Sequence, residues 1–214
     1  MQQIITIATM KGGSGKSTLA SCLGVHWHLK GRKSTVIDAD PQSSIARLAA
    51  RERALAGLPI VEDAGASVSK TAQDLARQGG LVIIDTPGFR SQATLDCIAA
   101  ADFVLVPVKA SPLDIDRMLD TLNTLINGTT RQPIFRCVLT QTTRESVIAK
   151  HIRAELIEAG FPVLANEMTN RVGYAEAALW GATPSIIDAR GVAAREIATI
   201  AEEIDSIIGI RQAA

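Results

Sequence analysis

The sequence predicts an α/β protein in which helices cover both faces of a mostly parallel, twisted sheet. Segments typical of strands alternate with segments typical of helices along the chain, and the strand segments are uninterrupted apolar runs rather than apolar–polar alternations. Uninterrupted runs are typical of parallel strands that helices bury on both faces. The chain has no internal repeat, low-complexity tract or long linker, so we expect a single domain over residues 1–214.

The expected strands are short apolar, β-branched runs that end at a loop or at a carboxylate. In chain order they are residues 2–9, 34–38, 81–85, 103–108, 134–140 and 161–165. The expected helices have apolar residues at helical spacing, and several stop at a glycine, as at Gly31 and Gly79. In chain order they are residues 16–30, 43–55, 67–78, 91–101, 113–126, 145–159, 172–180 and 192–208. Residues 57–65 form the stretch most typical of a loop.

Composition excludes several classes of protein. The 22 Lys and Arg residues balance 22 Asp and Glu residues, so bulk charge does not draw the chain to nucleic acid or to an acidic membrane. Three widely spaced cysteines, Cys22, Cys97 and Cys137, form no CxxC pair and predict reduced thiols in a cytoplasmic protein. The amino terminus lacks a signal-peptide pattern, and no apolar run approaches about 18 residues, so we expect no membrane span.

The most informative segment is the glycine-rich run MKGGSGKST, from Met10 to Thr18, between the first strand and the first helix. Glycines let the backbone curl so that successive N–H groups point inward, and the helix adds its N-terminal donors. Such a loop suits a triphosphate: Lys16 would reach the β- and γ-phosphates, and the Ser17 hydroxyl would coordinate Mg²⁺. The residues expected to bind nucleotide here are Lys11, Gly12, Gly13, Ser14, Gly15, Lys16, Ser17 and Thr18.

Carboxylates end two of the expected strands. Asp38 and Asp40 follow the second strand in VIDADPQ, and Asp85 ends the run LVIID. The carboxyl ends of parallel strands form the ligand-binding edge of a sheet, so these groups are expected beside the phosphate loop. One carboxylate of the pair could hold a Mg²⁺-bound water while the other orients the attacking water, and Asp85 could hold Mg²⁺ through water. Alternatively, the pair could cap the next helix, and Asp85 could be an ordinary strand end.

These motifs resemble those of the ParA/MinD family of P-loop ATPases. KGGSGKS, with its second lysine Lys11, is similar to the deviant Walker A motif of that family, DADPQ to its Walker A′ motif and LVIIDTPG to a Walker B motif. Two later stretches, residues 106–114 and 171–184, extend the resemblance over nearly the whole chain. The resemblance implies a P-loop NTPase fold of the small single-domain ParA type, with ATP and Mg²⁺ as cofactors.

The resemblance also implies roles for individual residues. Asp40 would position the hydrolytic water, and Lys11 and Lys16 would act on the phosphates. The residues implied to lie at the metal are Ser17, Asp38 and Asp85. The residues implied to contact adenine are Thr140 and Pro184. Gln141 follows Thr140 where the family frequently has Asn.

A function follows from the same resemblance. ATP would bring two copies together face to face, with Lys11 of each copy reaching the phosphates bound by the other. The dimer would bind non-specific DNA of the nucleoid, and a ParB-like adaptor would stimulate hydrolysis and release, which positions a plasmid, chromosome or protein cargo. The candidate DNA-binding residues are Arg144, Lys150, Arg153, Arg171, Arg190 and Arg195. Residues 140–214 nevertheless carry seven Lys or Arg against ten Asp or Glu.

Three alternatives stay open on sequence alone. A MinD-like protein would dock on a membrane through an amphipathic, cation-bearing end, but residues 204–214 have one Arg and one Asp, and their isoleucines are expected to close the core. An electron carrier like the nitrogenase iron protein would need two cysteine ligands in glycine-rich loops, whereas Cys97 and Cys137 lie in an expected helix and strand. A nucleotide-switched scaffold with little hydrolysis would share the same binding motifs.

Overall fold

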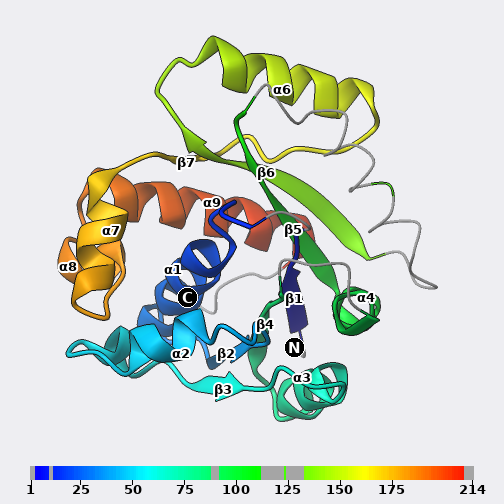
Figure 1. The fold of residues 1–214 in the computed structure, drawn as a ribbon, viewed down its shortest axis with the longest axis vertical. Coiled ribbons are helices and arrows are strands. Elements are labelled where there is room, and N and C mark those ends of the chain that lie inside the picture. The colour runs from blue at the N-terminus through cyan, green and yellow to red at the C-terminus, as the bar shows by residue number, and fades with distance from the viewer. Residues whose placement is uncertain (1–2, 10–11, 88–91, 112–122, 124–132, 210–214) are drawn as a thin grey trace.

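The structure, a computed structural model, describes residues 3–9, 12–87, 92–111, 123 and 133–209. Within these residues the strands form one sheet in which every neighbouring pair is parallel, in the order β3-β2-β4-β1-β5-β6-β7 (Figure 1). The strands are β1 (Gln3–Ile7), β2 (Ser34–Asp38), β3 (Ile60–Glu62), β4 (Leu81–Asp85), β5 (Phe103–Lys109), β6 (Ile134–Thr142) and β7 (Met168–Thr169). The predicted α/β fold with a parallel sheet is confirmed.

Alternate side chains of the central strands enter two separate hydrophobic cores. In β1, Ile4 belongs to one core and Ile5 to the other, and in β4 Val82 and Ile83 divide in the same way. Successive side chains of a strand point to opposite faces of its sheet, so a strand buried on both faces has few positions for a polar residue. This is the physical reason for the uninterrupted apolar runs.

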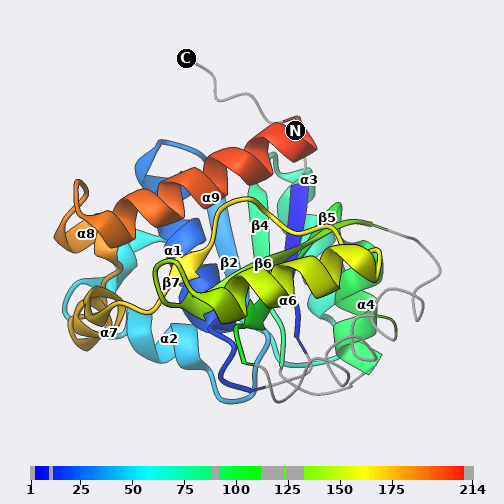
Figure 2. The same ribbon diagram turned by 90° about the horizontal axis from the view of Figure 1, so that it is seen from above.

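Helices cover both of these faces (Figure 2). Helices α1, α2 and α9 pack on the core that contains Ile5, and α3, α4 and α6 pack on the core that contains Ile4. Trp27 of α1 is completely buried and donates its indole N–H to Asp205 of α9 over 3.0 Å, which joins these two helices. The helices are α1 (Lys16–Leu29), α2 (Ser44–Ala49), α3 (Val68–Arg77), α4 (Gln92–Ala100), α6 (Val147–Glu158), α7 (Val172–Leu179), α8 (Pro184–Ile187) and α9 (Val192–Ile208).

The strand predicted over residues 161–165 is wrong. This segment makes a single bridge, Val163 to Cys137, and the edge strand beside β6 is β7, a few residues later. Pro162 has no N–H to donate to a strand ladder, which limits pairing at this point of the chain. Leu164 still fills the core as a strand residue would, since it is completely buried.

The helix predicted over residues 43–55 is too long, since α2 ends at Ala49. A 3₁₀ turn, η1 (Ala54–Gly57), follows, and its non-glycine residues have positive φ angles, 49° at Leu55 and 56° at Ala56. Left-handed backbone costs roughly 1–2 kcal/mol per non-glycine residue. Leu55 offsets this cost because it is completely buried and donates its N–H to the carbonyl oxygen of Gly181, 2.9 Å away.

The remaining elements follow the sequence with small shifts at their ends. The stretch predicted as a loop, 57–65, contains the short edge strand β3, and α8 was not predicted at all. The helix predicted over 113–126 lies outside the described residues except for Asn123, and so do the first residues of the predicted strand 2–9 and helix 91–101. The single-domain organisation remains a prediction.

Candidate functional site

Strands β2 and β4 bring the predicted carboxylates to one edge of the sheet, beside the end of β1. Asp85, the last residue of β4, lies in register with Ile7 of β1 and with Asp38 of β2. Asp38 is 1% exposed and Asp85 is completely buried. The glycine-rich loop leaves β1 at this same edge. Residues far apart in the sequence therefore meet at the carboxyl ends of three adjacent strands, as the strand pattern predicts.

The glycine-rich loop wraps the start of α1. Gly13 and Gly15 have φ angles of 75° and 83°, which side-chain-bearing residues rarely adopt. Gly15 caps α1, so Lys16 is the first helical residue, and Lys16 is only 8% exposed. The loop borders a cleft of about 740 Å³ whose opposite wall includes Asp40, Pro41 and Gln42. Met10 and the predicted catalytic Lys11 lie outside the described residues.

Lys16 is held between two carboxylates. Its Nζ lies 3.6 Å from Oδ1 of Asp85 and 3.9 Å from Oδ2 of Asp40. Burial raises the pKa of Asp85 to about 6, and the Lys16 ammonium opposes this rise. Burial also raises the pKa of Asp38. The cleft thus offers a buried ammonium whose present partners a triphosphate could replace or join.

Carboxylate oxygens at this edge are left without hydrogen-bond donors. Within the described part of the chain, Oδ1 of Asp38 and both side-chain oxygens of Asp85 are buried and accept no hydrogen bond. Ser17 lines the cleft beside them. Hydroxyl and carboxylate oxygens suit Mg²⁺, which keeps several waters and takes other ligands from substrate phosphates.

In both Asp38 and Asp40, one carboxylate oxygen accepts backbone hydrogen bonds and the other does not. Oδ2 of Asp38 accepts the N–H groups of Ile45 at 2.8 Å and Ala46 at 3.0 Å, so it caps α2. The capping role considered from the sequence is thus confirmed for this oxygen. Oδ1 of Asp40 accepts the N–H of Gln42 at 2.9 Å, which leaves Oδ2 facing Lys16.

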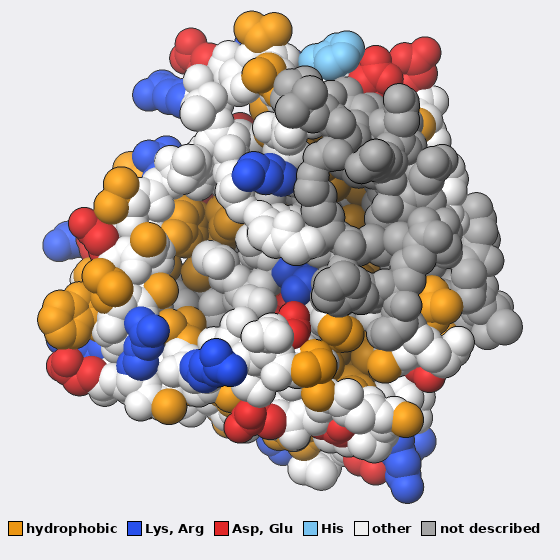
Figure 3. All heavy atoms as spheres, in the orientation of Figure 1, with side chains coloured by type: hydrophobic (Ala, Val, Ile, Leu, Met, Phe, Trp, Pro, Cys, Tyr) orange, Lys and Arg blue, Asp and Glu red, His pale blue; other side chains and the backbone are white. Residues whose placement is uncertain are grey.

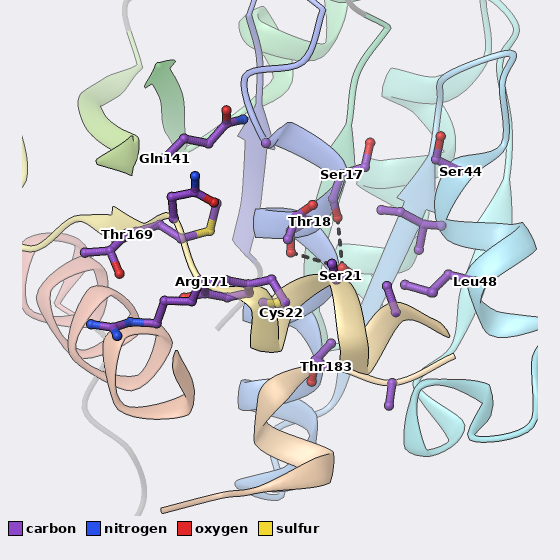
Figure 4. A pocket seen from close by; sticks show the side chains of 18 residues that line it. Ser17, Thr18, Ser21, Cys22, Ser44, Leu48, Gln141, Thr169, Arg171 and Thr183 are labelled. Atoms are coloured by element: carbon purple, nitrogen blue, oxygen red, sulfur yellow. Dashed lines mark hydrogen bonds between the residues drawn. The ribbon is translucent and has the colours of Figure 1, made fainter. Parts of the chain in front are cut away.

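A second pocket of about 430 Å³ continues from the loop along α1. Its labelled side chains include Ser17, Thr18 and Ser21 on α1, with Gln141 and Thr183 on other walls (Figure 4). On the face drawn in Figure 3 the molecule is hollowed in the region where Figure 1 places α1. The pocket is polar along the helix and has the volume for a nucleoside.

The two residues implied to contact adenine do not line this pocket. Thr140 is completely buried, and its hydroxyl donates to the carbonyl oxygen of Ser14 over 2.8 Å. Pro184 is buried as well, while the adjacent Thr183 supplies the wall. Gln141, next to Thr140, does line the pocket.

A family model described as the CobQ/CobB/MinD/ParA nucleotide binding domain matches residues 5–184. This chain belongs to that family, as a ParA/MinD-type P-loop ATPase. It is 30% identical to a maintenance of carboxysome distribution protein A from Gloeobacter kilaueensis over 95% of this chain and 94% of that one. It is 28% identical to a protein ParA from Rhizobium radiobacter over 80% of each. MinD from Pyrococcus horikoshii, solved with Mg-ADP, has the same fold, with a TM-score of 0.76 at 18% identity and 100% coverage of both chains.

In this ParA/MinD-type chain, one wall of the second pocket is hydrogen-bonded to α9 through the carboxylate of Glu196. Glu196 accepts hydrogen bonds from the Thr169 N–H and hydroxyl, from Nε of Arg171 at 2.7 Å and from the hydroxyl of Tyr174 at 3.1 Å. Burial raises the pKa of Tyr174, which keeps this hydroxyl a donor. Figure 4 shows the Arg171 side chain extending away from the pocket. No sequence motif of the ParA/MinD type pointed to Glu196.

The candidate DNA-binding residues do not form one cluster. Arg144, Lys150 and Arg153 lie in or beside α6, whereas Arg190 and Arg195 lie at the junction of α8 and α9 (Figure 1). Arg153 donates to the carbonyl oxygen of Leu164 and pairs with Glu167, and Arg171 pairs with Glu196. Figure 3 shows Lys and Arg side chains scattered over the visible face rather than gathered in a patch. Arg153 and Arg171 are therefore engaged within the subunit.

The three cysteines of this ParA/MinD-type chain should be inert in the folded protein. Cys22, Cys97 and Cys137 are free, at most 2% exposed, and burial raises the pKa of each thiol to about 12. Ellman's reagent at pH 8 should label none of them in buffer within minutes and all three in concentrated urea. Rapid labelling of the native protein would contradict this, and so would a brown colour from a bound iron–sulfur cluster.

Proposed function

We propose that this chain is a ParA-like positioning ATPase that binds Mg-ATP in the cleft beside the glycine-rich loop. The observation that carries the proposal is the placement of Lys16 between Asp85 and Asp40, beside carboxylate oxygens that lack donors. A buried cation beside unsatisfied carboxylates costs free energy unless a ligand completes the arrangement. A triphosphate with a divalent cation has the complementary charges.

The residues divide the work of hydrolysis. The loop N–H groups and Lys16 would bind the β- and γ-phosphates, and Ser17, Asp85 and Asp38 are the residues that would hold Mg²⁺. Bound Mg²⁺ supplies neutralisation of the charge that develops on the phosphates. Asp40 would orient the attacking water, because its Oδ2 lies 3.9 Å from the ammonium of Lys16, the residue proposed to bind the γ-phosphate.

ATP-dependent pairing of two copies makes this hydrolysis a switch. Lys11 of one copy would neutralise charge between two stacked nucleotides, so that the dimer exists only while the γ-phosphate is present. The dimer would bind non-specific DNA on the nucleoid of the cytoplasm, and a ParB-like adaptor would stimulate hydrolysis. The names of two relatives, a maintenance of carboxysome distribution protein A and a chromosome-partitioning ATPase Soj, support positioning of a protein compartment or a chromosome as the outcome, and a plasmid would be a cargo of the same class.

Two substitutions should separate pairing from hydrolysis. Lys11→Ala should bind Mg-ATP but sediment as a monomer, whereas Asp40→Ala should form the ATP dimer and release phosphate at least about a hundredfold more slowly. Analytical ultracentrifugation with ATP and a phosphate-release assay, alone and with DNA, measure both effects. Lys33→Ala is the matched control, because Lys33 lies at the opposite, amino-terminal edge of β2 and bonds the carbonyl oxygen of Gln78. An ATP-stable dimer without Lys11 would refute the switch.

The alternatives differ in measurable ways. A MinD-like membrane role is not favoured by α9, because Ile204 is completely buried and Ile207 and Ile208 pack against the same core. No helix of the described residues has the length and apolarity to cross a bilayer. A nucleotide-switched scaffold would pair with ATP but show no turnover with or without DNA, which the same phosphate-release assay detects.

A further inference from the structure

The direction of the phosphate-loop amides depends on where the loop carbonyls point. An N–H group can face a phosphate only if the flanking carbonyls turn away, and buried carbonyls need donors of their own. Two consecutive loop carbonyls have such donors at the end of β6. The Thr140 hydroxyl donates to the oxygen of Ser14 over 2.8 Å, and Nε2 of Gln141 donates to the oxygen of Gly13 over 2.6 Å.

The backbone at the end of β6 is irregular and directs Thr140 and Gln141 toward the loop. Thr140 is completely buried and lies in register with Lys109 of β5 and Met168 of β7. The β6–β7 register shifts between Thr140 and Thr142, and Gln141 at this irregularity has a φ of 53°. A bulge of this kind re-aims a side chain, at the cost of a left-handed residue.

Contacts at Gly15 show how closely the loop rests on these strands. A Cβ added at Gly15 would lie 3.1 Å from Cε of Met168 and 3.9 Å from Cβ of Thr140. The loop is therefore bounded on this side by β6 and β7 and on the other by the cleft. Thr140 and Gln141, which supply these donors from β6, do not line the cleft that contains the proposed phosphate site.

We propose that Thr140 and Gln141 are positioning residues that set the phosphate loop before nucleotide arrives. They hold the carbonyls of Gly13 and Ser14 outward, so that the neighbouring amides already converge where the phosphates bind. Preorganised donors lose less conformational entropy on binding, which raises affinity without a new contact to the ligand. The inference rests on the proposed nucleotide site and replaces the adenine contact that the resemblance implied for Thr140.

The two residues differ in one respect that makes the inference testable. Gln141 also lines the second pocket, whereas Thr140 does not. A change at Thr140 should therefore weaken every ligand that has phosphates and leave the nucleoside moiety unaffected. Thr140→Val removes the donor and keeps the shape, and Thr140→Ser restores the donor.

Affinities of wild type and variants for Mg-ADP and inorganic tripolyphosphate should be measured by calorimetry, and the affinity for adenosine by ligand-observed NMR. Thr140→Val should weaken Mg-ADP and tripolyphosphate by the same factor, about tenfold, with adenosine unchanged. Thr140→Ser should stay within about threefold of wild type. Thr142→Val is the matched control, because this buried Thr of the same strand donates instead to Glu167 over 3.0 Å.

The outcomes distinguish a failure of the positioning role from a failure of the nucleotide site itself. Equal losses for adenosine and Mg-ADP in Thr140→Val, or no loss for either, would overturn the positioning role. Failure of the wild type to bind Mg-ADP at all would refute the nucleotide site itself. If Thr140→Val does not fold, Gln141→Leu gives the second test: tripolyphosphate affinity should fall two- to threefold, and an unchanged value would count against the loop contact.

Discussion

Replacing Lys16 by alanine should abolish measurable ATP hydrolysis and weaken Mg-ATP binding by at least about a hundredfold. Lys16 is the buried cation of the cleft, 8% exposed and within 4 Å of both Asp85 and Asp40. Its removal leaves two carboxylates to repel the phosphates, and the pKa of Asp85, now about 6, should rise further because the ammonium that opposes burial is gone. Calorimetry with Mg-ATP and a phosphate-release assay measure both losses.

The general loss of one positive charge does not explain such a result if the control behaves as expected. Lys33→Ala removes one lysine from the far edge of the sheet and should keep wild-type affinity and turnover. Lys16→Arg keeps the charge but lengthens the side chain in a confined site, and it should recover part of the affinity and little of the turnover. Binding of Mg-ATP by Lys16→Ala within about threefold of wild type would place the phosphates elsewhere.

The Gly181→Ala substitution should cost about 2–4 kcal/mol of unfolding free energy. Gly181 is buried between α7 and α8 with a φ of 67°. A Cβ there would lie 2.5 Å from Cβ of Arg51 and 2.7 Å from the carbonyl oxygen of Leu48, so α2 or the turn after it must move. Urea unfolding followed by circular dichroism gives the loss.

Gly31→Ala is the control that measures the cost of a positive φ at alanine without the steric clash that the added Cβ makes at Gly181. Gly31 has a φ of 80°, and none of the described residues lies within 4 Å of an added Cβ. It should lose only about 1 kcal/mol. A movement of α2 would shift Asp38, which caps that helix at the edge of the proposed nucleotide site. Gly181→Ala should therefore also weaken Mg-ATP binding, whereas Gly31→Ala should not. Equal stability losses in the two variants would show that the contact between α2 and Gly181 is not tight.

The placement of the carboxylates at one edge of the sheet could be predicted because it depends on local patterns and on the parallel topology. Asp38, Asp40 and Asp85 each follow a strand that reads as a buried parallel run, and parallel strands end on one edge. The glycine-rich loop has residue types whose conformational needs are visible in the sequence. Patterns of a few residues were therefore enough to predict that these strands exist and that Asp40 and Asp85 lie near Lys16.

Contacts that depend on long-range register could not be predicted in this way. The hydrogen bond from Thr140 to Ser14 spans 126 positions and exists only because β5 alone separates β6 from β1 in the sheet. Glu196 collects donors from three residues that precede it by 22 to 27 positions, with no motif to indicate it. The left-handed turn at Leu55 and Ala56 uses residues that normally avoid positive φ, so tertiary burial overrides local preference there.

The central position of β1 in the sheet has a consequence for synthesis on the ribosome. The phosphate loop emerges before Asp85 and Thr140, which lie on either side of it in the finished fold. A nascent chain therefore has the loop sequence long before it has the site, and nucleotide can stabilise only chains whose sheet is assembled through β6. ATP would then stabilise chains in which β1, β4 and β6 have already come together, and it would have no effect on the earlier steps of folding.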